Sequence, residues 1–134
     1  MVGVARCTYG EGVRVLICDD EPDIRLLFRM AFEEVGAEVT EAVDGNDCIA
    51  QAKAGCPELV ILDLFMPDRD GLSALPELRR ACPDARVLVV SAHAAVEIFS
   101  QSRARGATAC FEKVDFASRI PSLAERYGGA AHIC

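Results

Sequence analysis

Polar side chains that could do chemistry stand at the ends of four short apolar segments in this 134-residue chain. They are the carboxylates of Asp19, Asp20 and Asp63, the hydroxyl of Ser91 and the amine of Lys113. If the segments lie side by side, the carboxylates repel one another, at about 4 kcal/mol per pair for ~4 Å and an effective dielectric of ~20. A hard divalent cation relieves this repulsion, and Mg²⁺ suits a small site of oxygen ligands. The residue types therefore predict a magnesium site that faces an amine and a hydroxyl.

Phosphoryl transfer is the chemistry that this set of residues favours. An aspartate is a competent nucleophile toward phosphorus once a metal neutralises the incoming group, and the product is an aspartyl-phosphate. Mg²⁺ and Lys113 can stabilise the oxygens of the transferred group, and the Ser91 hydroxyl can donate to one of them. Taken singly, each residue also has an ordinary structural explanation, as a helix cap, a turn residue or a solvated charge. Their joint occurrence at the ends of neighbouring strands favours the functional interpretation.

The elements that must position these residues alternate between strand and helix. Strands are expected at residues 13–18, 37–42, 59–63, 86–90 and 108–112. Helices are expected at about residues 22–35, 45–55, 72–82 and 94–105, and from Pro121 to about Tyr127. This alternation predicts an α/β fold with a doubly wound, five-stranded parallel sheet in the flavodoxin-like order 2-1-3-4-5 and helices on both faces. Ligands of such sheets bind beyond the carboxyl ends of the strands, where the polar residues stand.

Composition limits the other classes of function. The net charge of −7 and the pI of about 4.8 argue against a nucleic-acid-binding or membrane surface. No apolar run approaches the ~20 residues of a membrane span, and no signal peptide is evident, so we expect a cytoplasmic protein. The seven cysteines are odd in number and show no Cys-x-x-Cys spacing, which favours reduced, buried thiols over a disulfide or metal framework. One domain is expected over residues 13–127, with a flexible arm at 1–12 and a short tail at 128–134.

Four motifs in this order resemble the receiver domains of two-component response regulators. They are the acidic pair in Cys-Asp-Asp-Glu-Pro-Asp, the Asp-Leu-Phe-Met-Pro-Asp-Arg-Asp-Gly segment that starts at Asp63, the pair Ser91 and Ala92, and Lys113 after a Gly-Ala-Thr-Ala stretch. The resemblance covers residues 13–127, nearly the whole chain. It implies that Asp63 is the phosphoacceptor and that Ser91 and Lys113 bind the phosphoryl group. The donor would be a phosphohistidine on a sensor histidine kinase or a histidine phosphotransfer protein.

The resemblance also implies a set of magnesium ligands. Asp20 and Asp63 would bind Mg²⁺ directly, Asp19 would act through water, and the backbone carbonyl of Phe65 would be a further protein ligand. Receivers of this family also catalyse their own dephosphorylation, so self-phosphorylation and autodephosphorylation would be the chain's only catalytic activities.

Two positions depart from the family pattern. Proline usually follows the lysine in a cis peptide, whereas Val114 follows Lys113 here. A cis bond before a residue other than proline costs ~2.5–4 kcal/mol, so we expect a trans bond and a somewhat different loop. Cys110 occupies the position, three before the lysine, where the family usually carries an aromatic switch residue. Phe111 is one step along, on the opposite face of the strand, and is expected in the core.

The leading hypothesis is a stand-alone, chemotaxis-type receiver that switches protein contacts. Its output surface would be the fourth helix, the fifth strand and the fifth helix, which phosphorylation would shift by pulling Ser91 inward. An alternative is the receiver portion of a longer DNA-binding transcriptional regulator. A magnesium-dependent small-molecule phosphatase of the haloacid dehalogenase type is a weaker alternative, because those enzymes want a second aspartate where Phe65 stands.

Overall fold

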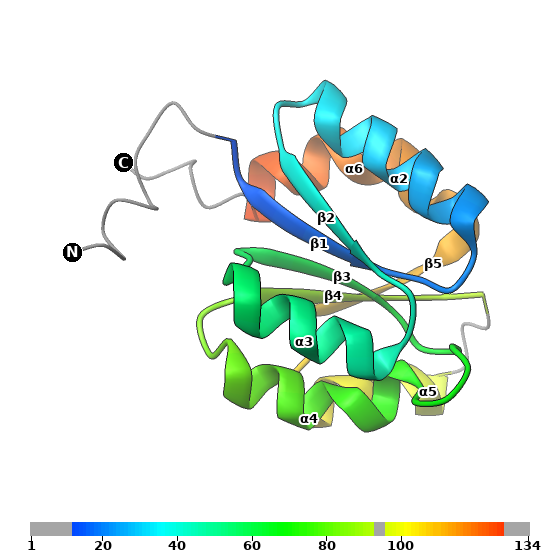
Figure 1. Ribbon diagram of the computed structural model, residues 1–134. Coiled ribbons are helices and arrows are strands. Elements are labelled where there is room, and N and C mark those ends of the chain that lie inside the picture. Colours follow the sequence, from blue (N-terminus) through cyan, green and yellow to red (C-terminus); the bar gives the residue numbers. More distant parts are fainter. Residues whose placement is uncertain (1–11, 93–95, 128–134) are drawn as a thin grey trace.

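A computed structural model of the chain describes residues 12–92 and 96–127 (Figure 1). In this part of the chain the strands are β1 (Arg14–Cys18), β2 (Glu38–Ala42), β3 (Leu59–Asp63), β4 (Arg86–Ser91) and β5 (Ala109–Glu112). The helices are α2 (Pro22–Glu34), α3 (Gly45–Gly55), α4 (Gly71–Ala81), α5 (Val96–Ala104) and α6 (Lys113–Tyr127). All strand pairs are parallel and their order is β2-β1-β3-β4-β5, so the predicted doubly wound fold is confirmed. The predicted arm, apart from Gly12, and the predicted tail lie outside the described residues.

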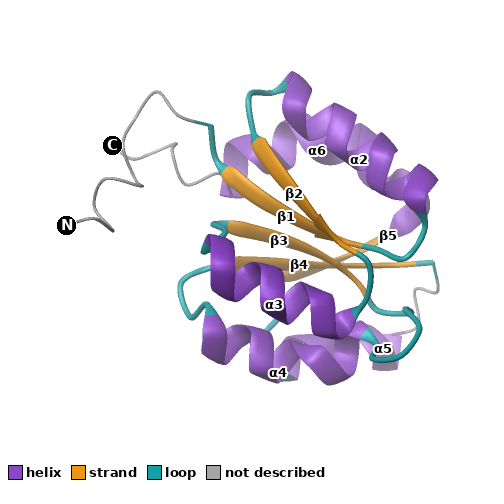
Figure 2. Cartoon of the chain, viewed as in Figure 1, coloured by secondary structure: helices purple, strands orange, loops and turns teal. Residues whose placement is uncertain are grey.

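Helices cover both faces of the sheet. α2 and α6 lie against one face, and α3, α4 and α5 lie against the other (Figure 2). The central strand β3 requires both layers, since all of its residues are buried. Leu59 and Ile61 pack with side chains of α2 and α6, whereas Val60 and Leu62 pack with side chains of α3 and α4. An uninterrupted apolar run is typical of a parallel strand that is buried on two sides.

Strand pairing brings the carboxyl ends of the central strands to one edge of the sheet. β3 pairs with β1 through Leu62 and with β4 through Asp63. Ser91, the last residue of β4, pairs with the last residue of β5. Asp19 and Lys113 directly follow the last residues of β1 and β5. The register therefore places the predicted site residues along a single edge.

Side-chain caps fix the starts of two helices at this edge. The Asp44 carboxylate accepts a hydrogen bond from the Asp47 N–H at 2.8 Å at the start of α3. The Asp70 carboxylate accepts one from the Ser73 N–H at 2.7 Å at the start of α4. Aspartate is favoured at this position because its carboxylate binds a backbone N–H that has no partner within the helix. The second cap also ends the loop that follows Asp63.

The start of the last helix differs from the prediction. Pro121 is expected in the first turn, but α6 begins at Lys113 and contains the proline in its interior. Phe116, Ile120 and Leu123 follow one another at helical spacing and are buried against the sheet. Their burial outweighs the backbone hydrogen bond that a proline removes.

Pro76 also lies inside a helix, in the middle of α4. Proline has no N–H, so the carbonyl of Leu72 loses its usual partner four residues on. The Arg105 guanidinium donates a hydrogen bond to this carbonyl at 3.2 Å. The lost helical bond is thus replaced by one from the end of α5.

Across residues 12–92 and 96–127, none of the helices combines the length and apolar character needed to cross a bilayer.

Candidate metal centre

Three carboxylates meet at the carboxyl edge of the sheet. Ligand oxygens of Asp19, Asp20 and Asp63 all lie within 4.8 Å of one another. Asp19 and Asp63 are buried, and Asp20 is exposed. The predicted cluster is therefore present, with one side open to water. A cluster that offers only oxygens and keeps one open side fits Mg²⁺, which prefers oxygen ligands and retains several waters.

The loop after β1 holds Asp19 in place. The Asp19 N–H donates to the carbonyl of Ala42 at 3.1 Å, and the Asp19 Oδ1 accepts from the Glu21 N–H at 2.9 Å. The Arg25 guanidinium donates to the Asp19 carbonyl at 2.8 Å. The contact with Glu21 engages Asp19 Oδ1, whereas Asp19 Oδ2 faces the charged amine of Lys113. The position of this carboxylate is thus set by β2 and α2 as well as by β1.

Lys113 provides the positive charge of the site. Its Nζ lies 2.8 Å from Asp19 Oδ2 and 3.2 Å from Asp63 Oδ2, and only 13% of its side chain is exposed. The third contact, at 3.1 Å, is with Glu21 Oε1. Lys113 therefore lies with the carboxylates, as predicted from its position after β5.

Burial changes the acid–base behaviour of the site. Burial of Asp63, together with the nearby Asp19 charge, raises the pKa of its carboxyl to about 6, although Lys113 and the Phe65 N–H oppose the shift. Burial alone would lower the pKa of Lys113, but its hydrogen bond to Asp19 and the charge of Asp63 outweigh this and raise the pKa. The amine is therefore held as a cation and balances the carboxylates in the absence of a metal ion.

The remaining predicted residues lie on the same edge. Ser91 is fully buried at the end of β4, beside β3. The Phe65 N–H donates to Asp63 Oδ1 at 3.2 Å, so this residue belongs to the turn that holds the acceptor carboxylate. Binding of a metal ion or a phosphoryl group by either residue remains a prediction.

Glu21 is a member of the site that the sequence did not predict. Its position before Pro22 indicates only the start of a helix, whereas its side chain reaches Lys113. The available signal was a third acidic residue directly after Asp19 and Asp20. Sequence alone does not show that Lys113 would lie within reach.

The departures near Lys113 have the expected structural effects. The described residues contain no cis peptide bond, so the bond between Lys113 and Val114 is trans, as predicted. Phe111 packs on the α6 side of the sheet, 5.6 Å from the ring of Phe116, which confirms its contact with the core. Cys110 points to the other side, toward the carbonyl of Phe99. The usual aromatic position therefore carries a thiol in this chain.

The cysteines form no disulfide among the described residues. Cys18, Cys48 and Cys82 are buried, Cys110 is half-buried and Cys56 is exposed. Burial raises the pKa of the Cys18 and Cys82 thiols, which disfavours the reactive thiolate. The two remaining cysteines and both histidines of the chain lie outside the described residues.

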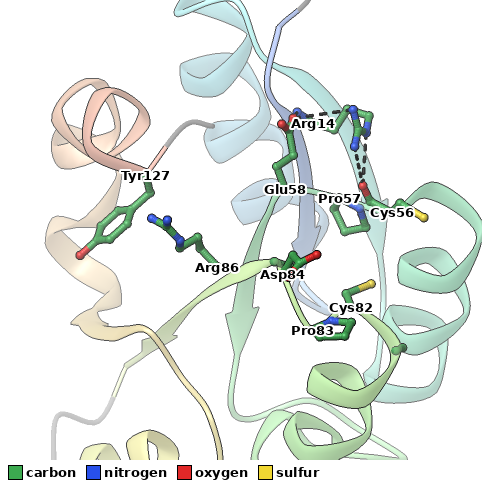
Figure 3. Close-up of a pocket in the computed structure, with 11 residues that line it drawn as sticks. Arg14, Cys56, Pro57, Glu58, Cys82, Pro83, Asp84, Arg86 and Tyr127 are labelled. Carbon is green, nitrogen blue, oxygen red and sulfur yellow. Dashed lines mark hydrogen bonds and ion pairs between the residues drawn. The ribbon is translucent and has the colours of Figure 1, made fainter. Parts of the chain in front are cut away.

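A pocket of about 380 Å³ lies at the opposite edge of the sheet, at the amino ends of the strands (Figure 3). The side chains around it include Arg14, Cys56, Glu58, Cys82, Arg86 and Tyr127. Arg14 is already engaged there, since its guanidinium donates to the Cys56 carbonyl at 2.8 Å. No residue of the carboxylate site lines this pocket, so the pocket is separate from the candidate metal centre.

Gly71 allows the loop after β3 to return close to Asp63. A Cβ at Gly71 would lie 2.3 Å from the Asp63 carbonyl oxygen and 3.0 Å from the Leu64 Cα. We expect Gly71→Ala to lower the free energy of unfolding by about 1–3 kcal/mol, because the obstructing atoms are backbone. Urea denaturation measures this change. The matched control is Gly55→Ala, whose Cβ meets nothing within 4 Å, and an equal loss in both variants would contradict the steric explanation.

Comparisons with known proteins decide the family. The model described as response regulator receiver domain matches residues 15–122. The chain belongs to this family. Receivers of two-component systems interact with histidine kinases or phosphotransfer proteins and with downstream targets, and they generally bind Mg²⁺ at an acidic pocket. The receiver fold and the acidic cluster described above agree with that membership.

Individual relatives of this receiver include long and short proteins. The probable transcriptional regulatory protein TcrX of Mycobacterium tuberculosis is 41% identical over 88 residues, which are 66% of this chain and 38% of TcrX. The chemotaxis protein CheY of Thermotoga maritima is 34% identical over 82 residues, which are 60% of this chain and 68% of CheY. The solved receiver domain of the putative response regulator NarL from M. tuberculosis is 30% identical, with a TM-score of 0.79 over 89% of this chain and 98% of that one. The receiver thus spans well under half of TcrX.

Proposed function

We propose that Asp63 accepts a phosphoryl group from a phosphohistidine and that the product switches protein contacts in two-component signal transduction. The observation that carries this proposal is the meeting of Asp19, Asp20, Asp63 and Lys113 at one edge of the sheet. Two buried carboxylates beside a half-buried amine are costly for stability alone, and such arrangements are concentrated at functional sites.

Each residue of the site would have a distinct role in phosphoryl transfer. Mg²⁺, held by Asp19, Asp20, Asp63 and the Phe65 carbonyl, would neutralise the oxygens of the incoming group. An Asp63 oxygen attacks phosphorus, an O–P bond forms, and the N–P bond to the donor histidine breaks. Lys113 then pairs with a phosphoryl oxygen, and the Ser91 hydroxyl donates to another. Above pH 6 most of Asp63 is ionised and ready to attack.

The donor protein would approach over exposed apolar side chains next to the acceptor. A groove of about 320 Å³ between α2 and α6 is lined by apolar side chains, among them Ile24, Leu27 and Val114, and by Lys113. Phe65 is 49% exposed and Val114 is 84% exposed. Exposed apolar groups gathered beside a reactive centre favour a protein partner, so we infer that the phosphohistidine-bearing protein docks here.

The downstream target would bind the surface formed by α5, β5 and α6. These elements are the predicted fourth helix, fifth strand and fifth helix. Ser102 is the one buried residue in the described helix α5, and no residue of β5 is fully buried. Few buried contacts make an element easy to displace, which suits a response to a phosphoryl group on Asp63 that draws Ser91 inward. The net charge of −7 over the whole chain argues against a nucleic-acid target.

A second candidate function is that of the receiver within a longer DNA-binding regulator. TcrX is named a probable transcriptional regulatory protein, and the matched part is 38% of its length. In that case phosphorylation of the same Asp63 would control an attached effector domain. An open reading frame that continues past Cys134 would decide for this alternative.

Labelling with a small phosphodonor tests the assignment of the acceptor. With Mg²⁺ and acetyl phosphate, we expect the wild-type chain to gain the mass of one phosphoryl group, and Asp63→Asn to gain none. Asp68→Asn is the matched control, because Asp68 is exposed in the same loop and asparagine tolerates its positive φ of 63°. A chelator of Mg²⁺ should abolish labelling of both the wild type and Asp68→Asn. Equal labelling of Asp63→Asn and wild type would point to another acceptor.

A further inference from the structure

Lys113 has a third carboxylate partner besides Asp19 and Asp63. Glu21 Oε1 lies 3.1 Å from the Lys113 Nζ, between the distances to the other two carboxylates. A lysine ammonium carries three N–H donors, and three carboxylates lie within 3.2 Å of this one. A phosphoryl group on Asp63 adds several oxygen acceptors beside Lys113, and these compete with the existing partners for its three donors.

Exposure decides which partner leaves at the lowest cost. The side chain of Asp19 is 2% exposed and that of Asp63 is 5% exposed, whereas that of Glu21 is 61% exposed. Separation of Asp19 from Lys113 would leave a buried charge without its countercharge. Asp63 carries the phosphoryl group and cannot leave. Glu21 regains water as soon as it turns away, so its ion pair is the weak one.

The backbone of Glu21 does not need to move in this exchange. Its N–H is fixed by Asp19 Oδ1 at 2.9 Å, and the following Pro22 begins α2. Rotation of the exposed side chain is therefore sufficient to release Lys113. The same anchoring keeps the Glu21 carboxylate near the site after release.

We propose that Glu21 is the exchangeable partner of Lys113, which holds the amine in the resting receiver and yields its place to the phosphoryl group. The inference rests on the proposed role of Asp63. Glu21 is thus a positioning residue that acts through Lys113 and slows phosphorylation. Its removal frees one donor of Lys113 before the phosphoryl group arrives.

A metal-free experiment tests the contact directly. Lys53 and Lys113 are the two lysines of the chain, and the Lys53 side chain is 61% exposed, so Lys53 is an internal reference for an amine-acylating reagent. We expect Glu21→Gln to raise the rate of Lys113 acylation relative to Lys53 by about two- to fivefold, the value for loss of an exposed ion pair. Asp23→Asn, which removes another exposed charge from the first turn of α2, should leave the ratio unchanged.

A kinetic experiment tests the consequence for phosphorylation. At saturating Mg²⁺ with acetyl phosphate, we expect Glu21→Gln to be labelled about two- to fivefold faster than wild type, and Asp23→Asn to match wild type. Equal acceleration by both substitutions would assign the effect to the general field of α2 and overturn the proposal. An unchanged rate, or an unchanged acylation ratio, in Glu21→Gln would also overturn it. Failure of the wild type to become labelled would instead contradict the proposed function of Asp63.

Discussion

The Asp63→Asn variant is expected to resist urea better than the wild-type receiver at pH 7.5. The fold raises the pKa of Asp63 from 3.8 to about 6, so the charged form is less stable in the folded chain than in the unfolded one. A shift of this size corresponds to about 3 kcal/mol, and partial solvent screening reduces the expected gain to about 1–2 kcal/mol. Asparagine has nearly the same shape and carries no charge, so it removes this penalty.

The pH dependence of this effect has a definite sign. Between about pH 4 and pH 6 the folded wild type binds more protons at Asp63 than the unfolded chain does, so its free energy of unfolding falls as pH rises through this range. Below that range the carboxyl is protonated in both states, and the advantage of Asp63→Asn should vanish. Urea midpoints of both proteins across pH 3–8, without metal ions, measure the difference. Identical midpoints at pH 7.5 would contradict the penalty.

The Lys113→Met variant is expected to be strongly destabilised in the absence of metal ions. Methionine keeps most of the aliphatic stem but removes the cation that contacts Asp19 and Asp63. Loss of one partner of a buried ion pair costs about 3–5 kcal/mol, and the open side of the site reduces the expected loss to about 2–3 kcal/mol. Thermal or urea unfolding at pH 7.5 measures it.

Two further conditions distinguish a charge effect from a packing effect in Lys113→Met. Mg²⁺ should restore much of the lost stability, because a divalent cation can replace the missing countercharge. Lower pH should also restore part of it, because protonation of Asp63 removes one of the repelling charges. A loss that neither Mg²⁺ nor acid reduces would show that the side chain matters for packing alone. Lys53→Met is the control, since the Lys53 side chain is 61% exposed and its ion pair with Glu77 spans 4.0 Å.

Much of the fold was predictable because the strongest signals were repeated along the chain. Five alternations of strand and helix allow few topologies once crossovers are right-handed, and the uninterrupted run before Asp63 indicates a strand buried on both faces. The meeting of Asp19, Asp63 and Lys113 follows from that topology, since they stand at the carboxyl ends of β1, β3 and β5, which share one edge of the sheet.

The start of α6 could not be predicted from such repeated signals. Proline is a local signal, and Pro121 indicated a first turn. The decisive contribution was the burial of Phe116, Ile120 and Leu123, which depends on the position of the sheet beneath them. Tertiary packing of this kind overrides local preference. The contact of Glu21 with Lys113 was hidden for a related reason, because the two residues are separated by 92 positions and meet only in the folded chain.

Helix α6 begins at the residue that carries the amine and ends at Tyr127, beside the pocket at the far edge of the sheet (Figure 3). Its 15 residues make a rod of about 22 Å, at 1.5 Å per residue. A tilt of about 5° at its amino end would swing the other end by about 2 Å. Because Lys113 and Tyr127 are the two ends of one helix, a tilt of α6 at the carboxylate site would also move the lining of this pocket.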